Sequence, residues 1–136
     1  MFYENERRGY NWPVVKKVIQ PATMIYKAIS LKQPWANLVA SGKKSIETRK
    51  WSTKYRGDLV ICSSQKPDIH PAGCAIAIAE LYDVKPMEKK DEKKACIKVY
   101  PKAHSWFLKN IRRIEPIKVK GSLGIYDLEL KIRAAK

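Results

Sequence analysis

The residues best able to do chemistry in this sequence lie close together between Ser41 and Arg49. Lys44, if held in a pocket, would lose hydration and its pKa would fall, so that it could act as a base. While still charged, the same side chain could stabilise an oxyanion. Glu47 could accept a proton or hold Lys44 in position, and the planar guanidinium of Arg49 suits a phosphate group. The structural alternatives are a hydrated Lys44 and an ordinary surface ion pair between Glu47 and Arg49.

The spacing of these residues restricts how they can meet. In a regular strand Lys44 and Glu47 would point to opposite faces, whereas Glu47 and Arg49 would share one face. Lys44 can reach Glu47 only from the turn before the strand or across a bulge. Glu80 also stands out, because it interrupts an otherwise apolar stretch. A charged residue in such a stretch is expected to lie at a strand end or at the mouth of a barrel, to pair with a cation, or to take part in chemistry.

Aromatic residues stand next to basic ones just after this segment. Trp51 follows Arg49 and Lys50, and Tyr55 precedes Arg56. An exposed ring can stack a single-stranded base while neighbouring cations hold phosphates. Packing of both rings against the rim of the domain is an equal alternative. Three polar residues at the end of an expected strand could line the same cleft: Ser64, Gln65 and Lys66.

The elements that must position these residues can be predicted from the hydrophobic pattern. Period-two alternation and β-branched runs predict strands over 26–31, 45–49, 58–64, 74–84, 116–120 and 124–130. A helix is expected from Pro34 to Gly42, with Trp35 on its apolar stripe and therefore in the core. We expect 85–94 to be a charged loop and 100–111 to hold a short helix or turn. The pattern indicates a mostly β (α+β) domain closed as a small barrel with one or two helices.

The length suits one domain. At 136 residues and 15.7 kDa, the chain can bury a core without metal or disulfide support. Residues 24–131 form the expected domain, preceded by an N-terminal extension over 1–23 and followed by a basic tail over 132–136. The odd, widely spaced cysteines at positions 62, 74 and 96 fit reduced thiols in a cytoplasmic protein. No Cys-x-x-Cys or His-x-x-x-His pair is present, so neither a metal nor another cofactor is expected.

The net charge points to an anionic partner. Against 13 Asp and Glu there are 28 Lys and Arg, which gives +15 and a pI near 9.8. Such a surplus attracts polyanions, nucleic acid first and anionic membrane second, although it can also serve solubility alone. No apolar run approaches the roughly 18 residues of a membrane helix, and Met1–Gln20 lacks the apolar core of a secretory signal.

Four sequence blocks carry a resemblance to a known family. Residues 42–49 contain Gly-x-Lys-x-x-Glu-x-Arg, which resembles the signature of the ASCH domain, a PUA-like β-barrel. The other blocks are Leu-Lys-Gln-Pro-Trp-Ala at 31–36, Tyr-Arg-Gly-Asp-Leu-Val-Ile at 55–61, and Pro-Ile-Lys-Val-Lys-Gly with Leu-Gly-Ile-Tyr at 116–126. They occur in the family's order, and the resemblance covers about 24–131.

The resemblance implies nucleic-acid binding in a cleft beside the signature. Some similar members are enzymes, namely an acetylcytidine amidohydrolase and a protein with ribonuclease activity. By the resemblance, the amidohydrolase's lysine would fall on Lys44 and its glutamate near Glu80. Its threonine position holds Glu47 here, and Cys62 stands where the family's third strand often carries histidine.

We therefore predict a cytoplasmic monomer that binds RNA, another single-stranded nucleic acid or a nucleotide. The predicted cleft comprises Lys44, Glu47, Arg49, Trp51, Tyr55, Ser64 and Lys66. The alternative is an enzyme on a modified nucleoside or RNA, with Lys44 acting beside Glu80 and Glu47 in amide hydrolysis, or beside Arg49 in phosphodiester cleavage. A third hypothesis is a regulatory domain that binds protein and carries its charge for solubility.

Overall fold

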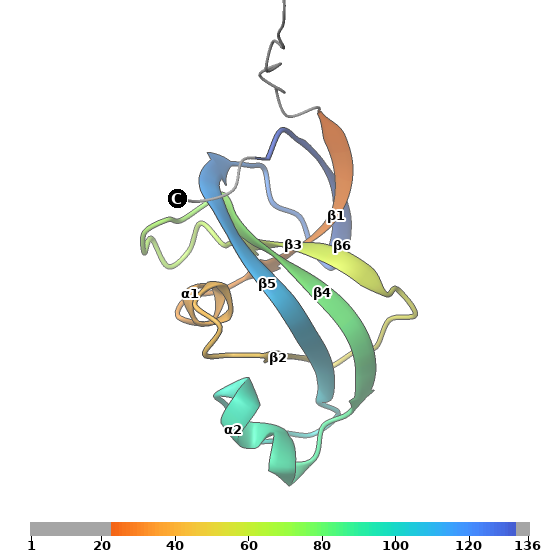
Figure 1. Cartoon of the computed structure of the whole chain (residues 1–136). Helices are drawn as coiled ribbons and strands as arrows, with labels where there is room; N and C mark the ends of the chain where they lie inside the picture. Colours follow the sequence, from red (N-terminus) through yellow and green to blue (C-terminus); the bar gives the residue numbers. More distant parts are fainter. Residues whose placement is uncertain (1–22, 133–136) are drawn as a thin grey trace, which may run out of the picture.

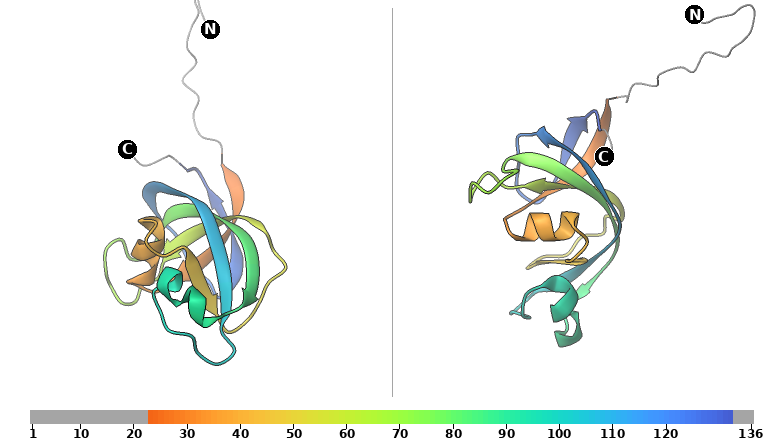
Figure 2. Two further views of the ribbon diagram at one scale, coloured as in Figure 1. Left: turned by 60° about the horizontal axis from the view of Figure 1, so that its bottom comes forward. Right: turned by 60° about the vertical axis from the view of Figure 1, so that its left-hand side comes forward.

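The computed structural model describes residues 23–132, which form a strongly curved sheet wrapped around a short helix (Figures 1 and 2). The strand order is β2-β5-β4-β3-β1-β6. In chain order the elements are β1 (Met24–Leu31), α1 (Trp35–Ala40), β2 (Ile46–Arg49), β3 (Gly57–Ser63), β4 (Cys74–Pro86), the 3₁₀ turn η1 (Lys89–Asp91), α2 (Glu92–Ala95), β5 (His104–Lys118) and β6 (Ile125–Leu130). This confirms the mostly β prediction.

Strands β1 and β3 are the parallel pair, and all other neighbours in the sheet are antiparallel. Their register places Leu31 opposite Ser63, so both strands end at the same level. The chain turns into α1 after β1, and Gly42, with φ of +84°, follows the helix and lets the chain turn back. The carboxyl ends of β1 and β3 therefore open side by side, next to the start of α1.

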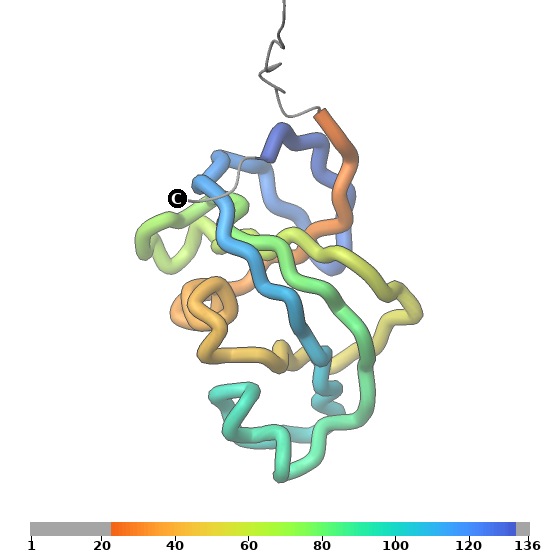
Figure 3. Tube along the Cα trace, in the orientation of Figure 1, coloured from red at the N-terminus to blue at the C-terminus, as the bar shows by residue number. Residues whose placement is uncertain are grey.

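The core lies between α1 and the inner face of the sheet. Ala36 and Val39 of α1 are fully buried against strand residues that include Leu59, Leu81 and Trp106. The expected strand over 74–84 is confirmed as β4, whose alanines let neighbouring chains pack closely. Register shifts interrupt its pairing with β5, and the long bent ribbon formed by the two strands is clear in Figure 3.

One prediction was wrong. Within the helix or turn expected over 100–111, only 101–102 form a turn, and 104–111 belong to β5, a 15-residue strand that continues to Lys118 through most of the strand expected at 116–120. Trp106 and Leu108 are buried on this strand, which pairs with β4 from Pro86–His104 to Cys74–Lys118. Pairing with a distant strand decides the conformation here, because the local sequence lacks a clear period of its own.

The charged segment expected as a loop over 85–94 contains local helical structure. Its first residues end β4, and η1 and α2 follow. The Glu88 side chain accepts from the backbone N–H of Asp91, and Asp91 reciprocally accepts from that of Glu88, which forms a capping box. The predicted extension over 1–23 and tail over 132–136 lie, apart from residues 23 and 132, outside the described residues.

Candidate nucleic-acid interface

A cavity of about 1050 Å³ opens where β1 and β3 end. Ser30 and Lys32 line it from the end of β1, and Cys62, Ser63 and Ser64 from the end of β3. Strand β2 and its continuation contribute the run 47–51, and the connection between β5 and β6 contributes 119–124. The carboxyl ends of parallel strands thus supply polar side chains to one hollow, as in many ligand sites of α/β sheets.

The charge lining the cavity is strongly positive. Its cationic side chains are Lys32, Arg49, Lys50 and Lys120, and its one acidic side chain is Glu47. Because Glu47 is itself paired with cations, as shown below, the lining presents a positive field to any molecule that enters. Such a cavity attracts phosphates more strongly than a carboxylate-lined one would.

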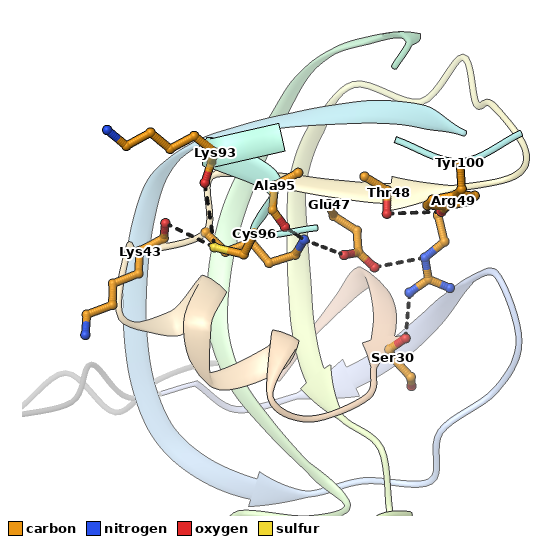
Figure 4. A network of polar contacts seen from close by, with 10 residues as sticks. Ser30, Lys43, Glu47, Thr48, Arg49, Lys93, Ala95, Cys96 and Tyr100 are labelled. Carbon is orange, nitrogen blue, oxygen red and sulfur yellow. Dashed lines mark hydrogen bonds and ion pairs between the residues drawn. The ribbon is translucent and has the colours of Figure 1, made fainter. Parts of the chain in front are cut away.

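Glu47 forms the centre of a buried ionic network (Figure 4). Its side chain is only 7% exposed, and one carboxylate oxygen, Oε2, accepts a 3.0 Å hydrogen bond from Nε of Arg49. Its other oxygen, Oε1, lies 3.6 Å from Nζ of Lys44. Arg49 also donates from Nη2 to the carbonyl of Ser30 at 2.8 Å. Glu47 and Arg49 share one face of β2, as their parity predicts, but Glu47 is buried and Arg49 only partly exposed, so they are not an ordinary surface pair.

Lys44 lies in the turn before β2, the position from which it can reach Glu47. It is 1% exposed, and Nζ donates to the carbonyl of Ala95 at the end of α2. Nζ also lies 5.8 Å from the centre of the Trp35 ring. Burial lowers the pKa of Lys44 from its usual 10.5, although the nearby carboxylate of Glu47 opposes this shift. Lys44 is absent from the cavity lining, so it acts on that surface through Glu47.

Two tryptophans and a tyrosine line the cavity. Trp51 is 39% exposed, and its ring meets that of buried Trp106 edge to face, with centroids 4.8 Å apart. Nε1 of Trp106 donates to the carbonyl of Trp51 at 3.2 Å, which holds the backbone in place. Trp35 packs against the core, as expected, and also reaches the cavity. Tyr100 enters from the segment after α2 and donates to Oγ1 of Thr48 at 3.0 Å.

Other predicted site residues lie elsewhere. The Tyr55 hydroxyl donates to the carbonyl of Asp58, and neither Tyr55 nor Lys66 lines the cavity. The structure does not bring Glu80 to Lys44. Instead, Oε1 of Glu80 accepts a 2.7 Å hydrogen bond from Asn110, and Oε2 lies 3.9 Å from Nζ of Lys109. Strand β5 thus satisfies this carboxylate, which accounts for an acidic residue within an apolar strand.

The sequence model of the ASCH domain family matches residues 29–118. The chain belongs to the ASCH domain family. This stretch includes the end of β1, all of α1, β2 and β3, and the buried ionic network. Three of the four sequence blocks, at 31–36, 42–49 and 55–61, lie inside the matched residues, and the fourth begins at their end.

Known relatives and structures agree with this assignment. The chain is 26% identical to human activating signal cointegrator 1 in a 132-residue alignment that covers 76% of this chain and 22% of the human protein. The mouse protein of the same name is 29% identical in a 79-residue alignment that covers 40% of this chain and 14% of that protein. The chain thus spans less than a quarter of either relative.

The fold is shared with solved ASCH structures. The crystal structure of ASCH from Zymomonas mobilis superposes with a TM-score of 0.56 at 19% identity, covering 69% of this chain and 73% of that one. A single-residue variant of the same protein superposes with a TM-score of 0.53 at 18% identity, covering 68% of this chain and 73% of that one. At these identities the superpositions show a common fold.

Several lining residues were missed by the sequence reasoning. Lys32 and Lys120 stand within blocks that carry the family resemblance, and that position was the available signal. Tyr100 has no such signal, because its place in the cavity depends on how the segment after α2 packs against β2. Within residues 23–132, no group of three or more His, Cys, Asp or Glu side chains is arranged to hold a metal ion. No helix in the same range is long and apolar enough to span a membrane.

Ser30 and Cys62 line the cavity, and both lie next to Tyr126. Oγ of Ser30 and the hydroxyl of Tyr126 share a hydrogen bond, and Cys62 lies next to Tyr126. Burial raises the pKa of Cys62 to about 11 and that of Tyr126 to about 12. At neutral pH these groups are therefore uncharged, and they add no negative charge to the cavity.

The buried thiol makes a testable contribution to alkaline stability. Because the folded-state pKa of Cys62 lies above its usual 9.0, its stabilising effect is complete below pH 9 and is lost as pH rises toward 11. Replacing Cys62 by Ala removes this dependence. Between pH 8 and pH 11 we expect wild type to lose about 2 kcal/mol more stability than Cys62→Ala, as measured by urea unfolding. A constant difference between the two proteins over this range would contradict the assignment.

Proposed function

We propose that this ASCH domain binds single-stranded RNA in the cavity at the ends of β1 and β3. The observation that carries the proposal is the combination of cations with an exposed tryptophan in one hollow. Lys32, Arg49, Lys50 and Lys120 supply positive charge, and Trp51 supplies a ring face. Base stacking on an aromatic ring with phosphates held by nearby cations is the common mode of single-strand binding.

Arg49 is the cationic side chain of the cavity best placed to contact a phosphate. Two of its N–H donors are already used, on Glu47 and on the carbonyl of Ser30, so the guanidinium is fixed in the cavity wall. Its side chain is still 23% exposed, which leaves its other N–H groups accessible. A pre-oriented guanidinium loses little conformational entropy on binding an anion, and its planar fork matches two phosphate oxygens.

The size of the cavity supports a strand more than a single nucleoside. At about 1050 Å³ it lies just above the usual range for small-ligand sites, which is roughly 300–1,000 Å³. A base stacked on Trp51 would fill only part of it. The remaining space suits neighbouring nucleotides, whose phosphates would approach Lys32, Lys50 and Lys120.

Catalysis has weaker support. Lys44 has a lowered pKa beside Glu47, which a base or an oxyanion stabiliser would need. However, Nζ of Lys44 already donates to the carbonyl of Ala95, and Glu80 is held by Asn110 on β5. The acid and base of an amide-hydrolysis mechanism are therefore not assembled around a small pocket, and the enzymatic alternative stays a prediction from the family resemblance.

The experiment that tests the proposal removes the stacking ring. Replacing Trp51 by Ala should weaken binding of a labelled single-stranded RNA of about six nucleotides by about tenfold, since each stacked base contributes about 1–3 kcal/mol. Fluorescence anisotropy at two salt concentrations would measure this, with a DNA duplex as the comparison ligand.

Tyr82 provides a matched control. It is 46% exposed, contacts Phe107, and lies outside the cavity lining. Tyr82→Ala should leave the RNA affinity within about twofold of wild type, because it removes an exposed ring without touching the cavity. Equal behaviour of both variants, with RNA and duplex DNA bound alike, would overturn the proposal and favour a domain that binds protein.

A further inference from the structure

A second basic surface lies outside the cavity, on the turn before β2 and on η1 and α2. We call it the α2 lysine surface and define it as Lys43, Lys89, Lys93 and Lys94. All four side chains are exposed, and none of them takes part in an ion pair among the described residues. Lys89 and Lys93 are four residues apart on consecutive helical turns, which places them on one side.

The three acidic residues of this segment form no ion pair with the α2 lysines: Asp91 and Glu92 are used inside the segment, and the exposed Glu88 pairs with Lys90 at 3.7 Å. Asp91 is buried, and its Oδ2 accepts from Oγ of Ser105 at 2.9 Å and from the backbone N–H of Glu88 at 3.0 Å. Oε2 of Glu92 accepts from the backbone N–H of Val99 at 2.9 Å. Both carboxylates hold the turn together, whereas the lysines point to solvent.

Backbone contacts join the turn before β2 to α2. Sγ of Cys96 lies 3.8 Å from the carbonyl oxygens of both Lys43 and Lys93, and the N–H of Ser45 donates to the carbonyl of Lys94 at 3.0 Å. In Figure 4 the side chains of Lys43 and Lys93 extend to the same side of the network. These contacts hold the turn that carries Lys43 against α2, which carries Lys93 and Lys94.

The surface and the cavity are connected through the same buried network. Lys44 reaches the carbonyl of Ala95 at the end of α2, and it also lies beside Glu47, which lines the cavity with Arg49. Figure 4 shows Lys43 and Lys93 at one end of this network and Arg49 at the other. Tyr100, a few residues after α2, also lines the cavity.

We propose that the α2 lysine surface binds the phosphate backbone of the RNA strand that leaves the cavity, so that the complete site is longer than the cavity. This inference rests on the proposed function. The four lysines are flexible point charges, which suits contact with phosphates regardless of base sequence. The cavity would then hold a base and its neighbours, while the α2 lysine surface would add affinity that depends on RNA length and on salt.

The test compares RNA lengths in two variants of equal charge. The surface variant replaces Lys43, Lys89, Lys93 and Lys94 by Ser. The control variant replaces four exposed cations outside the cavity lining by Ser: Lys54, Arg113, Lys118 and Lys131. Anisotropy is measured with RNAs of about six and about twenty nucleotides across a salt series, with thermal unfolding of each variant as the check on folding.

The surface variant should bind the long RNA about tenfold more weakly and bind the short RNA within about twofold of wild type. For the long RNA, the slope of log K against log salt should become shallower by about three in this variant. Four phosphate contacts are lost, and each contributes about 0.7 to the slope. The control variant should weaken both RNAs to a similar, smaller extent. In wild type itself, the slope for the long RNA should exceed that for the short RNA by about three.

The results separate this inference from the proposed function. Suppose that Trp51→Ala weakens binding of the short RNA, but that the surface and control variants bind the long RNA with equal affinity. Then the cavity binds RNA and the longer footprint is wrong. If wild type shows equal slopes for both lengths, the longer footprint is also wrong. If neither RNA responds to Trp51→Ala, the proposed function fails, and this inference fails with it. An acidic peptide that competes with RNA only in the presence of the α2 lysines would show that this surface binds protein instead.

Discussion

Replacing Glu47 by Gln is expected to lower the free energy of unfolding by about 3–5 kcal/mol, because it leaves buried charge without a partner. The side chains of Lys44 and Glu47 are 1% and 7% exposed, and glutamine preserves the shape of glutamate. The change removes the negative charge that compensates Lys44 and weakens the acceptor for Nε of Arg49. The ammonium of Lys44 and the guanidinium of Arg49 would then lie close together in a poorly hydrated part of the protein.

The pH dependence of this loss has a defined sign. Burial and the charge of Arg49 already lower the pKa of Lys44, whereas Glu47 raises it, so its pKa falls further in Glu47→Gln. Below that lowered pKa the folded variant carries the full cost of a buried ammonium. As pH rises from there toward 10.5, the folded state releases the proton and the deficit relative to wild type shrinks.

Urea unfolding of both proteins between pH 7 and pH 10 would measure the deficit and its trend. Glu129→Gln serves as the control, because Glu129 is exposed on β6 and its replacement should change stability by less than about 0.5 kcal/mol. A loss below about 1 kcal/mol in Glu47→Gln, or a loss that grows with pH, would contradict the assigned network.

Replacing Arg49 by Ala is expected to weaken binding of short single-stranded RNA by about 100-fold, since it removes a pre-oriented, charge-assisted donor from the cavity. Arg49→Lys should lose about tenfold, because lysine keeps the charge but lacks the fork that reaches Glu47, Ser30 and a phosphate together. The ratio of the two effects separates geometry from charge.

Arg112→Ala is the matched control for this measurement. Arg112 is exposed and forms a 2.8 Å ion pair with Asp58 outside the cavity lining, so its removal deletes the same charge elsewhere. We expect less than about threefold weakening from this change. If Arg112→Ala and Arg49→Ala weakened RNA binding equally, only general attraction between the basic protein and the polyanion would be at work. Thermal unfolding of Arg49→Ala, run in parallel, keeps loss of folding separate from loss of binding.

Local pattern was sufficient for much of the fold. The β-branched run before Ser63 and the Ala/Ile alternation after Cys74 predicted β3 and β4, because these stretches of both strands are buried. The parity of Glu47 and Arg49 placed both on one face, and the turn before β2 proved to be the place from which Lys44 reaches them. These features depend on neighbours within a few residues, which a sequence displays directly.

Local pattern failed where long-range pairing decided the structure. Trp106 lies on β5 because that strand pairs with β4 across register shifts, and nothing near Trp106 indicates where β4 will lie. The choice of Glu80 as a partner for Lys44 failed for the same reason. Its carboxylate is satisfied by Asn110 and Lys109, 30 and 29 residues further along the chain, once β4 and β5 are side by side.

The sequence by itself determined the family, the strongly basic charge, the mostly β architecture and the residue types of the network around Glu47. Only the tertiary structure decided that Lys44 is buried against the end of α2, and that Tyr100 and Lys120 join Arg49 and Trp51 around one cavity. The physical reason is that charge and periodicity are properties of the chain. Burial and convergence depend on the packing of segments that are distant in sequence.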